Sequence, residues 1–223
     1  MLIELVLIAL IVFLPLIAQS NITSTYNKYS KISNSKKLSG KDVARMILDR
    51  NGLHNVTIGE ISGNLTDHYD PRNKNIRLSQ NIYNGTSIAS VSVAAHECGH
   101  AIQDKESYSF LRFRTALVPI VNFTSRISSI LIIIGFASEL LNLVKIGILL
   151  LCIGLLFQLV TLPVEFNASN RGKKQLQELG LIDKSDINGS NKVLKAAAYT
   201  YVAGFLSTAL QILRLVLISR DRN

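Results

Sequence analysis

Long apolar blocks dominate this 223-residue chain. They lie at residues 2–18, 117–160 and 193–218. A helix needs roughly 17–25 mostly apolar residues to cross a bilayer, so each block is a candidate membrane segment. Only 17% of the residues are charged, against about 25% in an average soluble domain. A simple soluble globule and a disordered chain are therefore both excluded.

The middle block is too long for a single crossing. Glu139, Asn142 and Lys145 interrupt it, which predicts a hairpin of transmembrane helices at about 118–138 and 143–162. The first block predicts an N-terminal anchor, and the last predicts either a fourth spanning helix or a helix packed on the membrane. We therefore expect the following parts: anchor 1–19, polar portion 20–116, hairpin 117–163, polar segment 164–192 and C-terminal helix 193–219.

Basic residues indicate how the chain is oriented. The formal net charge is +9, and residues 20–116 hold 13 Lys and Arg whereas the turn 139–145 holds one. Cytoplasmic loops of membrane proteins are enriched in Lys and Arg, which places the polar portion on the cytoplasmic face of the cell membrane. Positive charge follows the first block, as in a retained anchor; a cleaved signal peptide is the alternative. With no Trp and few aromatic residues among the basic ones, we expect no nucleic-acid partner.

The polar portion contains signals for both helices and strands. Ser39 begins a helix with a capping-box-like pattern, and residues 87–103 form a small-residue, apolar pattern typical of a buried helix. Residues 75–79 alternate between apolar and polar, as a half-buried strand does. We expect this strand to pair with residues 56–61 across a turn at 70–74, and its central part, 76–78, to hold an extended substrate by strand addition.

The predicted buried helix carries the motif His96-Glu97-Cys98-Gly99-His100. Two histidines four residues apart project from one helix face, so both imidazoles can bind one Zn²⁺. Glu97, next to the first ligand, can reach the water on the metal rather than the metal and act as a general base. Gly99 keeps the helix slim between the two histidines.

Catalytic zinc usually takes three protein ligands, so a third must come from elsewhere. The candidates are His54, Asp67, His68, Asp70 and Glu165. Glu165 stands out because it follows a membrane span and lies two residues after Pro163, where we expect the span to break and a new helix to begin. His68 is either a structural turn residue or a contact to substrate or to the transition state, and Arg171 is a second candidate for such a contact.

These segments resemble the YugP-type neutral zinc metallopeptidases of bacterial membranes. The resemblance rests on the N-terminal span and on Leu65-Thr-Asp-His-Tyr-Asp-Pro71, His96-Glu-Cys-Gly-His-Ala101, Ala116-Leu-Val-Pro119 and Gln158-Leu-Val-Thr-Leu-Pro-Val-Glu-Phe166. The layout is also similar to HtpX-type metallopeptidases, in which a Glu after a transmembrane hairpin is a zinc ligand. That likeness implies Glu165 as the ligand; Ser169 stands where those proteins carry Asp, and Cys98 where the YugP pattern carries a small aliphatic residue.

Together these features predict a mainly helical α+β protein, with a zincin-like catalytic domain fused to about four transmembrane helices. The expected function is that of a membrane-embedded zinc endopeptidase, with His96, His100 and Glu165 as ligands and Glu97 as base. Its partners would be polypeptides, including membrane proteins, and the lipid bilayer. The alternative is a non-catalytic membrane protein with a structural or regulatory zinc site.

Overall fold

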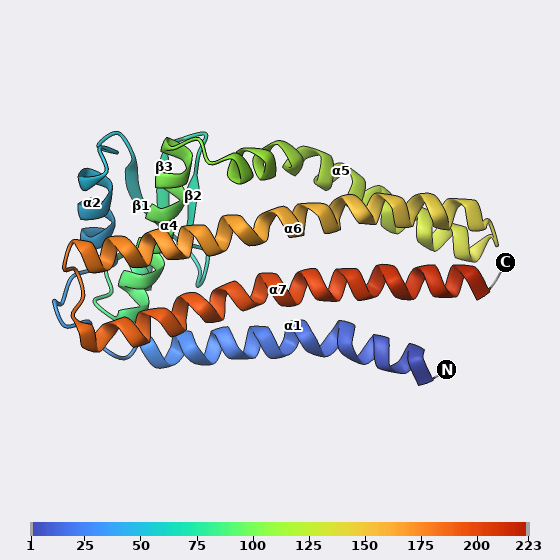
Figure 1. The fold of residues 1–223 in the computed structure, drawn as a ribbon, viewed down its shortest axis with the longest axis horizontal. Helices are drawn as coiled ribbons and strands as arrows, with labels where there is room; N and C mark the ends of the chain where they lie inside the picture. The colour runs from blue at the N-terminus through green and yellow to red at the C-terminus, as the bar shows by residue number, and fades with distance from the viewer. Residues whose placement is uncertain (1, 222–223) are drawn as a thin grey trace. The chain divides into compact units, whose positions relative to one another are not determined.

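A computed structural model describes residues 2–221 and confirms a mainly helical protein with one small sheet (Figure 1). Four helices in this part of the chain are long and apolar enough to cross a membrane, as the apolar blocks predict. They are α1 (Leu2–Tyr29), α5 (Ser109–Ala137), α6 (Leu141–Glu178) and α7 (Lys184–Asp221). The expected hairpin is formed by α5 and α6, which are separated by residues 138–140.

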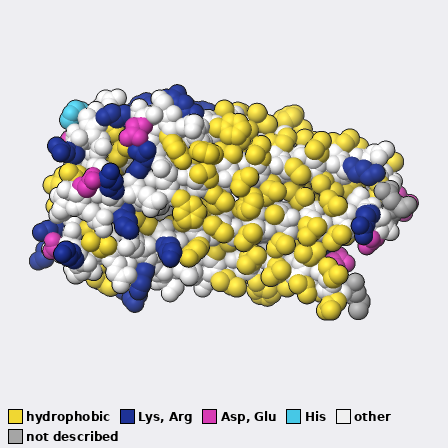
Figure 2. Space-filling view, in the orientation of Figure 1, with side chains coloured by type: hydrophobic (Ala, Val, Ile, Leu, Met, Phe, Trp, Pro, Cys, Tyr) yellow, Lys and Arg dark blue, Asp and Glu magenta, His cyan; other side chains and the backbone are white. Residues whose placement is uncertain are grey.

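The chain divides into two compact units. The apolar unit contains residues 2–19, 112–162 and 199–221. Its large side chains face outward: Phe123, Ile133 and Leu149 are between 67% and 69% exposed. Figure 2 shows hydrophobic side chains gathered over these segments. Such a continuous apolar surface requires a cover of lipid or protein.

The polar unit contains residues 20–111 and 163–198. Its core is formed by α2 (Gly40–Arg50) and α4 (Ile88–Lys105) packed on each other and on the sheet. The Ser39 side chain accepts a hydrogen bond from the Asp42 N–H while Asp42 accepts from the Ser39 N–H, so the predicted capping box is present. The unit also contains the short helix α3 (Gln80–Tyr83).

The sheet has three strands in the order β1-β3-β2, and this corrects two expectations. β1 (Thr57–Ile61) does pair with β3 (Asn75–Ser79), but the pairing is parallel. The turn after Asp70 instead joins β3 to β2 (His68–Asp70), which is antiparallel to it. Because β3 is the central strand, both of its edges are occupied, and residues 76–78 cannot accept a substrate strand.

Pro163 does not break the chain as we expected, because it lies inside the continuous helix α6. A proline removes one backbone hydrogen bond from a helix, but helices of membrane proteins tolerate this where neighbouring groups compensate. Glu165 consequently projects from the middle of a long helix rather than from the start of a new one.

Candidate metal centre

Helix α4 is almost wholly enclosed by the polar unit. Fourteen of its 18 residues are buried, including Glu97 and His100, and the His96 side chain is only 15% exposed. At its N-terminus the Ser87 side chain accepts a hydrogen bond from the Ser90 N–H. The small and apolar sequence around the motif therefore produces a buried helix, as predicted, and not a solvated face.

Two glycines allow α4 and α6 to touch backbone to backbone. A Cβ atom added at Gly99 would lie 2.2 Å from the carbonyl oxygen of Ala168, and one at Gly172 would lie 2.5 Å from that of Ala95. Neither distance is sterically allowed, so a side chain at either position would push the helices apart. This close contact brings the middle of α6 to the face of α4 that carries the two histidines.

The contact gathers His96, His100 and Glu165 into one cluster, whose candidate ligand atoms all lie within 4.8 Å of one another. Glu165 Oε2 is 3.3 Å from His96 Nε2 and 3.6 Å from His100 Nε2. Two ligand atoms about 2.0–2.1 Å from a tetrahedral zinc ion lie roughly 3.3–3.4 Å apart. The spacing and the donor set therefore both fit Zn²⁺.

The second ring nitrogen of His100 is held by Gln103. His100 Nδ1 lies 3.0 Å from Gln103 Oε1. The Gln103 amide nitrogen donates to the Val164 carbonyl at 2.8 Å and to Asn167 Oδ1 at 3.0 Å, which fixes Oε1 as the acceptor facing the ring. His100 must then carry its proton on Nδ1, and this leaves the Nε2 lone pair for a metal.

The second ring nitrogen of His96 meets Ser169, whose Oγ lies 3.0 Å from His96 Nδ1. Ser169 stands where HtpX-type proteins carry Asp. In this chain its hydroxyl makes the contact with the His96 ring. When Nδ1 carries the proton, the hydroxyl accepts from it and orients the ring without the negative charge that a carboxylate would add.

Glu97 lies beside the cluster without joining it. Burial raises the pKa of its carboxyl to about 7, and the negative charges of Glu165 and Asp67 act in the same direction. His96 and a backbone hydrogen bond at Tyr69 act in the opposite direction. A buried carboxyl with a pKa near neutrality can both take up and release a proton under ordinary conditions.

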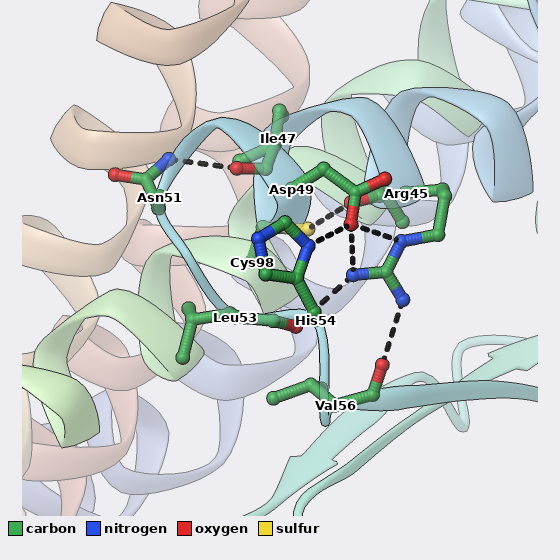
Figure 3. A network of polar contacts seen from close by, with 9 residues as sticks. Arg45, Ile47, Asp49, Asn51, Leu53, His54, Val56 and Cys98 are labelled. Carbon is green, nitrogen blue, oxygen red and sulfur yellow. Dashed lines mark hydrogen bonds and ion pairs between the residues drawn. The ribbon is translucent and has the colours of Figure 1, made fainter.

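The other candidate ligands lie outside the cluster. His54 is exposed, and its Nδ1 lies 3.0 Å from Asp49 in a network with Arg45 (Figure 3). His68 is exposed, with its Nδ1 2.8 Å from the Thr66 carbonyl.

The remaining two acids have structural partners. Asp67 accepts hydrogen bonds from the Ser79 N–H and hydroxyl, and Asp70 accepts from the Arg72 N–H in the turn between β2 and β3. Cys98, although it lies within the motif, faces the Ala44 carbonyl at 3.6 Å (Figure 3).

Arg171 is connected to the cluster through other residues. Its Nε donates to Asn167 Oδ1 at 2.6 Å, and its Nη1 lies 2.7 Å from Glu106 Oε2. Asn167 Oδ1 also accepts from Gln103, so a chain of hydrogen bonds runs from Arg171 to His100.

Sequence reasoning did not identify Gln103 and Asn167 as members of this network. The available signal was Gln103, the lone amide in residues 88–105, which lies about one helical turn after His100. A fully buried amide has to find hydrogen-bond partners, and here its neighbour on the same helix face is a candidate ligand.

Comparisons with known proteins point to the same chemistry. Residues 4–220 match a protein family described as "Putative neutral zinc metallopeptidase". The chain is similar to the "Putative membrane protease YugP" of Bacillus subtilis (strain 168), with 46% identity over 209 residues that cover 92% of this chain and 93% of that protein. No solved structure matches the chain. The family implies Zn²⁺ as the cofactor, and the cluster of His96, His100 and Glu165 could hold it.

Proposed function

Because the chain belongs to the family described as "Putative neutral zinc metallopeptidase", we propose that it is a membrane-embedded, zinc-dependent endopeptidase. The observation that carries this proposal is the division of roles around the cluster. Three side chains offer ligand atoms within 4.8 Å of one another, and a buried Glu97 lies next to them with its carboxyl outside the set. This division is typical of catalytic zinc, which keeps one position open for water.

We assign the three ligand positions to His96, His100 and Glu165. Zn²⁺ bound there would polarise the scissile carbonyl and make water a stronger nucleophile. Gln103 and Ser169 hold the two imidazoles by their Nδ1 atoms, so each ring presents Nε2 toward the metal. A proton on Nδ1 of each neutral ring leaves the Nε2 lone pair for the metal.

Glu97 is the proposed general base. Its carboxylate takes a proton from the attacking water as that water adds to the peptide carbonyl. The same carboxyl then gives the proton to the departing amine as the carbon–nitrogen bond breaks, which restores the starting protonation state. A pKa of about 7 suits a group that must accept and then release a proton.

The catalytic domain is proposed to be zincin-like, with the substrate polypeptide lying along β2. Strand β2 is an edge strand, and the backbone at Tyr69 is hydrogen-bonded to Glu97. An extended peptide added at such an edge would run close to the base. His68, which lies on β2, stays a candidate substrate contact, whereas the bonds of Arg171 to Asn167 and Glu106 favour a positioning role.

A non-catalytic zinc site is the second function to consider. A structural zinc site is normally closed by a fourth Cys or His ligand. Within residues 2–221 the cluster contains three candidate ligands, and Cys98 faces Ala44 instead. The buried Glu97 would also have no role in a structural site. These features favour catalysis.

We further propose that the polar portion faces the cytoplasm, because 13 Lys and Arg lie in residues 20–116 and one lies in 139–145. A cysteine introduced at Lys36 in a Cys152→Ser background should escape a membrane-impermeant thiol reagent, whereas one at Asn142 should react. The reverse labelling pattern would overturn this orientation.

The Glu97→Gln variant tests the proposed function. This substitution keeps the shape of the side chain and removes the base, so cleavage of a reporter polypeptide should fall by at least roughly 10²–10⁴-fold. Zinc content should stay at one equivalent, and Glu178→Gln, an exposed position on α6, should change neither quantity. A Glu97→Gln protein that cleaves at the original rate would instead support the structural-zinc alternative.

A further inference from the structure

A cavity of about 370 Å³ lies between α6 and α7 within the polar unit. Its polar lining comes from both helices: Ser169, Asn170 and Lys173 from α6, and Asn191 and Lys195 from α7. The volume is within the range of small-molecule sites. The amide, hydroxyl and ammonium groups together offer several hydrogen-bond donors to one ligand.

The charge of this cavity has a single sign. Lys173 and Lys195 both line it, and no Asp or Glu does. Neither lysine belongs to an ion pair in the described part of the chain, whereas the neighbouring Lys174 lies 3.6 Å from Glu178. Two lysines with no acidic partner, beside two asparagines, form a site for an anion rather than for a cation or a neutral group.

The remaining lining is apolar, and both helices change character at the cavity. Phe166 ends the apolar part of α6, after which the polar residues Asn167, Ser169 and Asn170 follow. On α7, Leu194 and Ala198 stand at the start of the apolar stretch. In helices that cross a membrane, a change from apolar to basic and polar residues marks the depth of the lipid headgroups.

We propose that this cavity binds the phosphate of an anionic phospholipid headgroup. Lys173 and Lys195 supply the charge, and Asn170, Asn191 and Ser169 supply hydrogen bonds to the phosphate oxygens. Phe166, Leu194 and Ala198 contact the part of the acyl chains that lies next to the headgroup. Basic pockets between membrane helices are suited to such headgroups because the phosphate and the hydrocarbon are recognised together.

The position of the cavity connects this lipid to the proposed metal centre. Ser169 lines the cavity, and its Oγ also lies 3.0 Å from His96 Nδ1. A hydroxyl can accept from the imidazole while it donates to a phosphate oxygen. The lipid would thus touch the residue that orients one candidate zinc ligand. This consequence rests on the proposed function, whereas lipid binding itself does not.

A lipid-binding titration with two matched double variants tests the proposal. Purified full-length protein in neutral detergent is titrated with fluorescent phosphatidylglycerol and, separately, with phosphatidylcholine. Lys173→Gln/Lys195→Gln removes the lysines of the cavity, and Lys174→Gln/Lys192→Gln removes two exposed lysines next to them with the same change in net charge.

The unmutated protein should bind phosphatidylglycerol at least about tenfold more tightly than phosphatidylcholine. The cavity double variant should lose about fivefold per lysine, or roughly 25-fold in all, while the control double variant stays within about twofold. Equal losses in the two double variants would overturn the proposal, since the attraction would then be diffuse. Inorganic phosphate that binds as tightly as phosphatidylglycerol would also overturn it and reassign the cavity to free phosphate. Glu97→Gln protein should bind the lipid normally, so failure of the peptidase proposal leaves this test intact.

Discussion

Helices α4 and α6 both supply residues to the candidate metal centre, but they do so in different ways. The contribution of α4 is local: His96 and His100 are one helical turn apart, so any helix over these residues puts both rings on one face. The contribution of α6 is tertiary: Glu165 follows His100 by 65 residues and reaches the cluster only because the two backbones touch at Gly99 and Gly172.

This difference shows which parts of the centre depend on docking of the two helices. Ligand atoms on α4 keep their spacing as long as the helix forms. Glu165, the hydrogen bond from Gln103 to the Val164 carbonyl, and the contact of Ser169 with His96 all require α6 at its observed distance. Variants on the two helices should therefore separate loss of a ligand from loss of the arrangement.

The largest expected effect is the loss of zinc caused by a substitution on α4. His100→Ala removes one of the three proposed ligands and should reduce zinc in the purified protein from one equivalent to background, because two ligands hold zinc far more weakly than three. The matched control is His54→Ala, which removes an exposed ring that pairs with Asp49. Metal analysis of both variants checks this. Full zinc retention in His100→Ala would show that His100 on α4 is not a zinc ligand.

A similar but somewhat smaller loss is expected from α6. Glu165→Ala should lower zinc affinity sharply, since it removes the carboxylate 3.3 Å from His96 Nε2. Glu178→Ala, in the exposed last turn of the same helix, should not. Competition with a zinc chelator measures both affinities. If the two variants retain zinc equally, the third ligand must be sought among Asp67, His68 and Asp70.

The three members of the candidate cluster were predictable from sequence to different degrees. The apolar blocks predicted the four long helices, and the motif predicted the buried α4 with both histidines, because each follows from local pattern. Glu165 emerged from its setting after a span and from the family resemblance, but one of the reasons given for it, a helix break at Pro163, is wrong.

Gln103 and Asn167, which support the cluster by hydrogen bonds, could not be predicted because no local sequence pattern contains them. The partners of Gln103 are the Val164 carbonyl and Asn167, both about 60 residues away in sequence and near only after the helices dock. The sheet shows the same limit: alternation predicted the strand 75–79, but not its central place between β1 and β2. Pairing partners depend on the whole unit, whereas alternation is local.

An intermediate loss of zinc affinity is expected from substitutions of the residues that hold the imidazoles. Gln103→Leu should weaken zinc binding by about 10–100-fold, because it removes the acceptor for His100 and two bonds to α6. Gln103→Glu restores an acceptor for His100 Nδ1 and should recover part of the affinity. Ser169→Ala should cost less, since it removes a single contact. Equal zinc affinity in all three variants and the unmutated protein would exclude a positioning role.

The smallest effect is expected on stability alone. Gly99→Ala places a Cβ atom 2.2 Å from the Ala168 carbonyl oxygen, and the required shift should lower the free energy of unfolding by about 1–3 kcal/mol. The control is Gly154→Ala on α6, where the added Cβ would meet no neighbouring atom within 4 Å, and it should be neutral or slightly stabilising. Thermal unfolding in detergent compares them. A Gly99→Ala protein as stable as the unmutated one would show that the backbone contact is not tight.

Removal and return of zinc tests the central claim, that this cluster supports peptide hydrolysis with Glu97 as base. The unmutated protein and Glu97→Gln are stripped with a chelator, dialysed and given one equivalent of Zn²⁺, and cleavage of a reporter polypeptide is followed with metal content. Cleavage should disappear on stripping and return with zinc in the unmutated protein, whereas Glu97→Gln should regain zinc and stay inactive. Cleavage by the stripped protein, or by zinc-loaded Glu97→Gln at the original rate, would contradict the account.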